Sequence, residues 1–166
     1  MEDSTTDVEK ISQALNWIVS LLNRHHIPYQ IVGGLAAKAY GARRPLVDID
    51  MYVPLEQAEG ALAEIKLYIT WGPAYYLDDW WDLTYLKIDY HGQRIEIGDS
   101  STNPRFYNRR DQRWESQTID FARSNIVRLY DVEVAVMPQD ELLAYKAMLD
   151  REVDHLDIQQ VTQSCG

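Results

Sequence analysis

The sequence predicts a single α+β domain in which a mixed β-sheet is flanked by helices. Helix-like and strand-like patterns follow one another in the order α-β-α-β-α-β-β-β-α, which is a mixed α/β or α+β arrangement. The chain has 166 residues and is 46% apolar, enough for one domain with a sizeable core. No repeat or low-complexity tract divides the sequence, so we expect one domain over residues 1–166 with its core at about 28–160.

A helix over about residues 7–25 is the first expected element. Thr6 and Glu9 have the spacing of a capping box, and Pro28 follows the expected helix end near residues 24–26. The apolar residues of this segment recur at helical spacing: Val8, Ile11, Leu15, Ile18 and Leu22.

Two short strands follow, separated by a glycine turn and a short helix. The first strand is expected at residues 29–32, and Gly33-Gly34 breaks it. A helix at 35–40 then leads to the second strand at 47–53, which is rich in β-branched residues.

The middle of the chain predicts one more helix and a β-hairpin. Apolar spacing indicates the helix at about 58–69, whereas residues 75–82, dense in aromatic and acidic side chains, favour no single element. Strands at 83–90 and 93–97 form the hairpin, and a polar loop is expected from 99 to about 117.

The C-terminal part predicts a β-rich segment and then two helices. The segment 127–136 has a turn at Asp131. The C-terminal helices are expected within about 139–162: the first begins after Pro138, and the second covers 153–161.

Composition excludes several classes of protein. The net charge of −10 disfavours broad nonspecific nucleic-acid binding, although residues 105–113 hold four arginines and one acid. No segment approaches the ~20 uninterrupted apolar residues of a membrane span, and the acidic N-terminus is not typical of a signal peptide. Cys165 is the only cysteine, which rules out an intrachain disulfide and favours the reducing cytoplasm.

An acidic pair on the second strand is the first candidate for chemistry. Side chains alternate along a strand, so Asp48, Asp50 and Tyr52 share one face. The opposite, core face is expected to carry Val47, Ile49, Met51 and Val53. Two carboxylates roughly 7 Å apart at Cα repel one another unless a cation lies between them. Carboxylates so placed would hold hard dications such as Mg²⁺, although an isolated Asp-x-Asp is more often a solvated strand surface.

A third acid would complete the site. Glu96 lies between Ile95 and Ile97 and therefore points away from their apolar face. If its strand neighbours 47–53, Glu96 joins the two aspartates. Asp99 is the alternative, and Asp89 on the partner strand is less favoured.

Two further features carry weaker signals. Gly33-Gly34 precedes a helix, where glycines let the backbone approach a ligand and free amides attract an anion, although such turns are also common without a ligand. Lys146 shares an apolar helix face with Leu142 and Leu149. Its ammonium either extends to solvent or reaches the acidic site or a substrate phosphate.

Taken together, these motifs resemble the minimal nucleotidyltransferase superfamily, which is related to the DNA polymerase beta fold. The resemblance rests on the run from Gly33 to Asp50, on Glu96, and on the C-terminal stretch VAVMPQDELLAYKAMLDREVDHLDI. The same pattern is similar to the branch of abortive-infection toxins and lincosamide or aminoglycoside nucleotidyltransferases, and it covers about residues 28–160.

The resemblance implies transfer of a nucleotide from a nucleoside triphosphate (NTP) to a hydroxyl acceptor. It assigns two Mg²⁺ ions to the acids Asp48, Asp50 and Glu96, with Glu96 also as a candidate general base. It assigns the triphosphate to Gly33, Gly34, Lys146 and Arg44, with Arg43 as the alternative to Arg44. Leu46 replaces a frequent hydroxyl residue, and Glu96 replaces the usual Asp, which leaves room for altered or lost activity.

The acceptor stays open between a small molecule, an RNA such as a tRNA end, and a protein. The segment 105–113 would stack bases and bind phosphates, or form a solvated loop or interface. The aromatic residues at 71–81 would wall an acceptor pocket, but we expect them to pack in the core or a dimer interface. The rival functions are an inactive binding module, such as a toxin–antitoxin component, and a phosphohydrolase; an oligomer is compatible with each.

Overall fold

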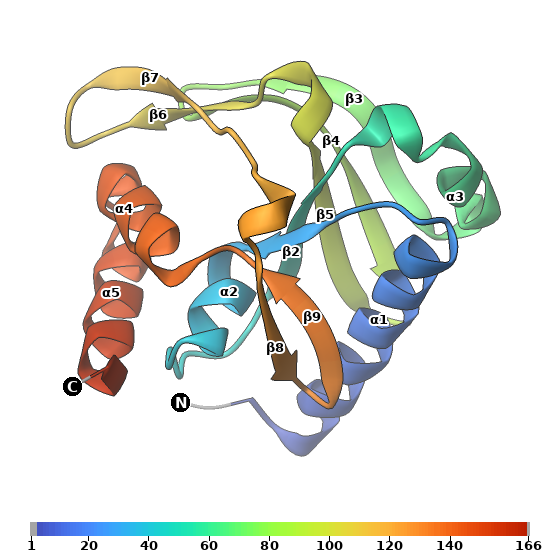
Figure 1. Ribbon diagram of the computed structural model, residues 1–166, viewed down its shortest axis with the longest axis horizontal. Helices are drawn as coiled ribbons and strands as arrows, with labels where there is room; N and C mark the ends of the chain where they lie inside the picture. The colour runs from blue at the N-terminus through green and yellow to red at the C-terminus, as the bar shows by residue number, and fades with distance from the viewer. Residues whose placement is uncertain (1–2, 166) are drawn as a thin grey trace.

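One mixed nine-stranded sheet forms the centre of the protein (Figure 1). The structure is a computed structural model that describes residues 3–165, and the side chain of Cys165 lies outside the described part. The sheet order is β7-β6-β4-β5-β2-β1-β9-β8, and β3 pairs with β4. The strands are β1 (Gln30–Val32), β2 (Asp48–Val53), β3 (Ile69–Leu77), β4 (Trp81–Tyr90), β5 (Gln93–Asp99), β6 (Arg105–Asn108), β7 (Arg113–Ser116), β8 (Asn125–Leu129) and β9 (Val132–Val136).

Helices cover both faces of the central strands. Figure 1 shows α1 on one side of β2 and β5, and α2, α4 and α5 on the other. The helices are α1 (Thr5–Arg24), α2 (Gly33–Ala39), α3 (Glu59–Glu64), α4 (Gln139–Leu149) and α5 (Glu152–Cys165). Among residues 3–165, none of them combines the length and the apolar character that crossing a bilayer requires. The expected α+β class, with a mixed sheet and flanking helices, is confirmed.

The first helix buries the apolar stripe that its sequence predicts except for Val8, which is 38% exposed in the first turn. Ile11, Leu15 and Ile18 are at most 1% exposed. The expected capping box is wrong, because the N-cap is Ser4, whose Oγ accepts a hydrogen bond from the Asp7 amide at 3.2 Å. The helix therefore begins before Thr6, and the side chain that satisfies its first turn is the serine.

The central strands place the acidic side chains. β2 pairs with β1 in antiparallel and with β5 in parallel orientation, and Asp50 lies opposite Glu96 in the β2–β5 register. Ile49, Met51 and Val53 face the core, as expected, and are at most 1% exposed. Val47 was expected to join them, but it precedes β2 and is 62% exposed. The alternation of buried and exposed side chains therefore starts at Asp48, the first residue of β2, and does not extend to Val47.

Two stretches contain more sheet than the sequence predicts. The expected helix at 58–69 shrinks to α3, and β3 continues through Gly72-Pro73 into the unassigned aromatic segment. Register shifts between β3 and β4 let this proline fit, since a bulged edge strand tolerates a missing amide donor. The expected polar loop 99–117 contains the β6–β7 hairpin, which packs through Phe106 against Tyr145 and Leu149 of α4.

Candidate functional site

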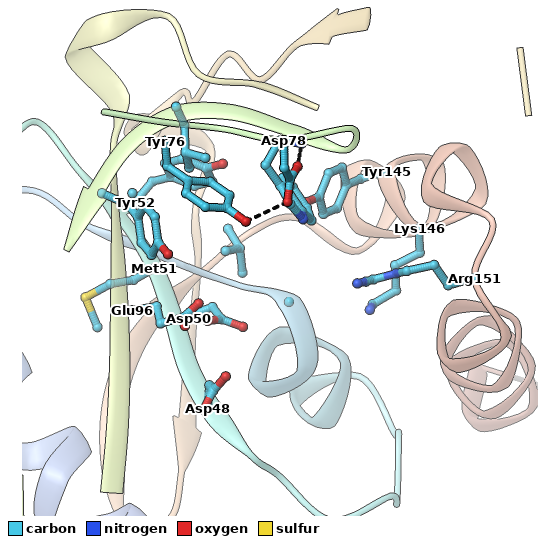
Figure 2. Close-up of a pocket in the computed structure, with 16 residues that line it drawn as sticks. Asp48, Asp50, Met51, Tyr52, Tyr76, Asp78, Glu96, Tyr145, Lys146 and Arg151 are labelled. Atoms are coloured by element: carbon cyan, nitrogen blue, oxygen red, sulfur yellow. Dashed lines mark hydrogen bonds between the residues drawn. The ribbon is translucent and has the colours of Figure 1, made fainter. Parts of the chain in front are cut away.

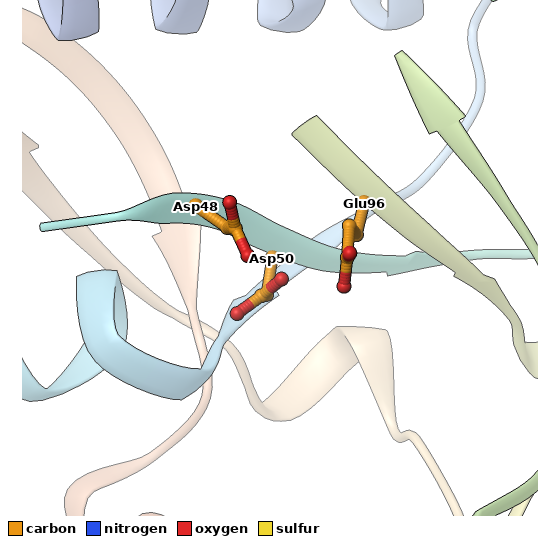
Figure 3. Close-up of side chains that lie close together, drawn as sticks. All are labelled: Asp48, Asp50 and Glu96. Carbon is orange, nitrogen blue, oxygen red and sulfur yellow. The ribbon is translucent and has the colours of Figure 1, made fainter. Parts of the chain in front are cut away.

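Three carboxylates meet on the face of the sheet that α2 and α4 cover (Figure 3). Asp48 and Asp50 come from β2, and Glu96 comes from the parallel neighbour β5. One oxygen of each side chain lies within 4.8 Å of the other two. The expected convergence of these acids is therefore found, and it follows from the two-residue repeat on β2 together with the pairing of Asp50 and Glu96.

The two other acids considered from the sequence lie outside this cluster. Asp99 is buried, and its Oδ1 accepts hydrogen bonds from the Leu55 and Ser101 amides. Asp89 accepts a hydrogen bond from the Gly92 amide in the β4–β5 turn. Both aspartates stabilise local backbone conformation, which leaves Glu96 as the third acid of the cluster.

The acidic cluster has the charge and the donor set of a divalent cation site. Burial, together with the Glu96 and Asp48 carboxylates, raises the pKa of Asp50 to about 7. Burial and the charge of Asp48 likewise raise the pKa of Glu96. Oδ1 of Asp48 is buried and accepts no hydrogen bond, although Arg94 Nε forms an ion pair with it at 2.8 Å. This oxygen, paired with the exposed side chain of Arg94 and lying beside two other carboxylates, suits a hard cation with oxygen ligands.

Because Gly33 has no side chain, the Asp50 carboxylate can lie close to the backbone of the β1–α2 turn. Its φ of +64° lies in the left-handed region, and a Cβ built there would lie 2.8 Å from Asp50 Oδ2. The glycine therefore both makes the turn from β1 into α2 and allows the backbone to pass close to the acidic cluster.

Gly33→Ala is expected to lower the free energy of unfolding by about 1–2 kcal/mol, because the left-handed backbone and the contact with Asp50 both add strain. Urea denaturation measures the effect. Gly60→Ala in α3 is the matched control: the nearest atoms to its Cβ are 3.9 Å away, so that variant should match or exceed wild type. A Gly33→Ala protein as stable as wild type would contradict this account of the turn.

The acids form the floor of a cleft of about 430 Å³ (Figure 2). Side chains from the sheet, from the β3–β4 hairpin and from α4 surround it. The lining residues are Val32, Gly33, Asp48, Asp50, Met51, Tyr52, Tyr76, Asp78, Trp81, Leu83, Tyr85, Glu96, Gly98, Tyr145, Lys146 and Arg151. The cleft therefore combines a carboxylate floor, a cationic side and an aromatic roof.

Lys146 and Arg151 form the cationic side, and buried aspartates hold them there. Lys146 is 1% exposed, and its Nζ lies 2.9 Å from Asp157 and 3.3 Å from Asp154. The alternative that Lys146 extends into solvent is therefore wrong. Arg151 donates from Nε and Nη2 to Asp154 at 2.7 and 3.1 Å. Two cations lining one wall suit a substrate with several negative charges.

The remaining candidates for phosphate binding lie beside the cleft. Arg44 donates from Nε and Nη2 to Asp157 at 2.7 and 2.8 Å, and a Cβ on Gly34 would lie 3.0 Å from that guanidinium. Arg43 donates its backbone amide to Gln160. Gly34, Arg43 and Arg44 are absent from the cleft lining given above, so a phosphate role for them stays a prediction.

Sequence reasoning missed much of the aromatic roof. Tyr76 and Trp81 line the cleft, although packing in the core or an interface was expected for them, whereas Trp71, Tyr75 and Trp80 do not line it. The roof residues that the sequence did not single out are Tyr52, Asp78, Leu83, Tyr85 and Tyr145, and Arg151 completes the cationic side. For Tyr52 a signal existed, because it shares the strand face of Asp48 and Asp50.

Solved structures of nucleotidyltransferases share this fold. TM1012 from Thermotoga maritima, assigned as a nucleotidyltransferase, matches with a TM-score of 0.67 at 15% identity, over 91% of each chain. The lincosamide antibiotic adenylyltransferase LnuA, bound to lincomycin, matches with a TM-score of 0.59 at 13% identity, over 99% of each chain. ANT(2″)-Ia in complex with adenylyl-2″-tobramycin matches with 0.56 at 14% identity, over 93% of this chain and 89% of that one.

In sequence alone, no family model and no curated protein matches the chain. At these identities the structural likeness shows the fold, and the chain has the minimal nucleotidyltransferase fold that its motifs predict.

Proposed function

We propose that the protein transfers a nucleotidyl group from an NTP to a hydroxyl acceptor in a metal-dependent reaction. One observation carries the proposal: three carboxylates from adjacent parallel strands face two aspartate-held cations across a single cleft. Carboxylates bind divalent cations and the cations bind phosphates, so the two sides together fit a metal-bound triphosphate. The shared fold of the adenylyltransferases supports the same reaction class.

The acidic residues of the cleft would bind the metal, and its cationic residues would bind the triphosphate. Asp48, Asp50 and Glu96 would hold one or two Mg²⁺ ions, which supply charge neutralisation and activation of the attacking oxygen. Lys146 and Arg151 would bind and orient the triphosphate.

The group transfer itself exchanges one bond at phosphorus for another. The acceptor oxygen forms a bond to the α-phosphorus, the bond to the pyrophosphate oxygen breaks, and pyrophosphate leaves with that electron pair. Glu96, whose pKa burial raises, would take the proton of the acceptor hydroxyl.

A small-molecule acceptor has the most support. LnuA was solved with lincomycin and ANT(2″)-Ia with adenylyl-2″-tobramycin, and both match this chain over most of their length. A net charge of −10 attracts cationic or neutral compounds more readily than a polyanionic RNA. RNA and protein acceptors remain outcomes that the test below would detect.

The test is incubation of the protein with labelled NTPs, Mg²⁺ and cell extract, followed by identification of the molecule that takes up label. Transfer predicts a nucleotidylated acceptor and released pyrophosphate, and both disappear with EDTA. Release of phosphate without a labelled acceptor would instead identify a phosphohydrolase. Thermal melting with Mg²⁺ and each NTP detects binding, because a ligand of the folded state raises the melting temperature. A protein that gives neither transfer nor a melting shift is a binding module, which contradicts the proposal.

A further inference from the structure

Two tyrosines that line the cleft have hydroxyls that bond to nothing in the protein. Tyr52 is 6% exposed and Tyr145 is 8% exposed. Within residues 3–165, neither hydroxyl has a hydrogen-bond partner. In Figure 2 the two rings enter the cleft from opposite sides, Tyr52 from β2 above Asp50 and Tyr145 from α4 beside Lys146. The unpaired hydroxyls therefore face the space in which a substrate would lie.

The ring of Tyr52 is fixed by packing. Tyr52 lies opposite Gly98 in the β2–β5 register, and its ring lies over that glycine. A Cβ on Gly98 would lie 2.5 Å from a ring carbon of Tyr52, so only glycine at position 98 leaves room for the ring. Packing of the ring against Gly98 therefore fixes the Tyr52 side chain, and its hydroxyl makes no contact that would help to hold it.

The ring of Tyr145 is fixed in a similar way. It meets Phe106 edge to face, with ring centroids 4.8 Å apart and an interplanar angle of 88°. Phe106 is 2% exposed and belongs to the cluster that anchors β6 on α4. A phenylalanine at position 145 would keep this contact unchanged.

Packing therefore explains the two rings but not their hydroxyls. Each hydroxyl opens into the cleft, where only water or a ligand can pair with it. A phenol is protonated at neutral pH, so each hydroxyl can donate a hydrogen bond. Two rings that keep an unneeded donor in a cleft indicate a ligand oxygen that accepts from them.

We propose that Tyr52 and Tyr145 bind the hydroxyl groups of a sugar-like ring in the cleft, an inference that rests on the proposed function. The Asp50 carboxylate beside Tyr52 disfavours an anion at that hydroxyl, whereas Lys146 and Arg151 offer the phosphates a place on the other side of the cleft. Asp78 accepts from Tyr76 through Oδ2 and from the Trp80 and Trp81 amides through Oδ1, so Oδ2 alone keeps a free lone pair as an acceptor, and Trp81 offers an aromatic face. Donors, acceptors and an aromatic face together suit a hydroxylated ring, which is either the ribose of the NTP or a ring of the acceptor.

The test uses Tyr52→Phe and Tyr145→Phe, which remove only the hydroxyls. Both variants should melt at or above the wild-type temperature, since no hydrogen bond within the protein is lost. Tyr40→Phe is the matched control outside the cleft: its hydroxyl donates to the Met137 carbonyl at 2.7 Å and accepts from Asn125. That control should lose stability and keep wild-type substrate binding.

Two arms distinguish the sources of the ring. In the first, equilibrium binding of ATP, 2′-deoxy-ATP and 3′-deoxy-ATP is measured with Mg²⁺. If the tyrosines contact the ribose, the variants should bind ATP about 3- to 10-fold more weakly than wild type. The variants should then bind the deoxy analogue that lacks the contacted hydroxyl as well as wild type binds it. In the second, transfer at saturating ATP is measured over a dilution series of the extract, and a contact with the acceptor raises the amount of extract needed for half-maximal rate.

Variants that match wild type in both arms would overturn the inference and leave the proposed function standing, because the hydroxyls would then contact only water. A wild-type protein that binds no ATP in the presence of Mg²⁺ would overturn the proposed function, and this inference with it. The two failures are therefore separable from one set of proteins.

Discussion

Asp50→Asn is expected to abolish nucleotidyl transfer, by at least about 10³-fold, while raising the melting temperature of the metal-free protein. The wild-type carboxylate is buried beside Glu96 and Asp48, and this environment raises its pKa to about 7. A carboxylate whose pKa is raised by folding destabilises the fold once pH exceeds the unfolded-state value. Replacing it with a neutral amide should therefore stabilise the protein by about 1–3 kcal/mol at pH 8. The same change removes one of the three carboxylates proposed to hold the metal.

Asp89→Asn provides the matched control for this experiment. Asp89 lies on the strand next to Glu96 and is outside the acidic cluster, and an asparagine can still accept from the Gly92 amide. Its activity should equal that of wild type. Transfer is measured with labelled NTP, and melting is followed with and without Mg²⁺, where only wild type and Asp89→Asn should gain stability from the ion. Wild-type transfer by Asp50→Asn would rule out the acidic cluster as the catalytic centre.

The acidic cluster was predictable because its geometry depends on short-range rules. The two-residue repeat of a strand places Asp48 and Asp50 on one face, and the same repeat turns Glu96 away from Ile95 and Ile97. Only one tertiary fact had to be assumed, namely that β2 and β5 are neighbours. The strand order confirms that assumption.

The cationic side and the roof of the cleft were less predictable because tertiary pairing creates them. Lys146 could be flagged as a lysine in an apolar stripe, but nothing local indicates that Asp157, on the next helix, holds it. The β6–β7 hairpin was missed because its strands are only four residues long, its segment is polar, and its order comes from pairing and from Phe106 packing on α4. Strand pairing of this kind overrides the polar character of a segment.

The buried ion pairs behind the cleft should dominate the stability of the C-terminal helices. Asp157→Ala is expected to lower the free energy of unfolding by about 3–5 kcal/mol, because it leaves Lys146 and Arg44 without a shared counter-charge. Asp157 is fully buried, and its two oxygens accept from both cations. Urea denaturation at pH 7 measures the change. Burial raises the pKa of Asp157, but the hydrogen bonds from Arg44 and Lys146 outweigh burial and lower it. The penalty should therefore persist at neutral pH and shrink only as pH falls below the ordinary carboxyl range.

A surface pair in the same region supplies the comparison. Asp150 forms an ion pair with His155, but both side chains are well exposed, and the left-handed backbone at residue 150 tolerates asparagine. Asp150→Asn should therefore change stability by less than about 0.5 kcal/mol. The double variant Asp157→Ala/Lys146→Met should lose less free energy of unfolding than the sum of the two single variants. The reason is that Lys146→Met removes a buried charge that Asp157→Ala has already left without its counter-charge. Strictly additive losses, or a loss below about 1 kcal/mol for Asp157→Ala, would mean that the wall behind Lys146 is held by packing alone and not by its aspartates.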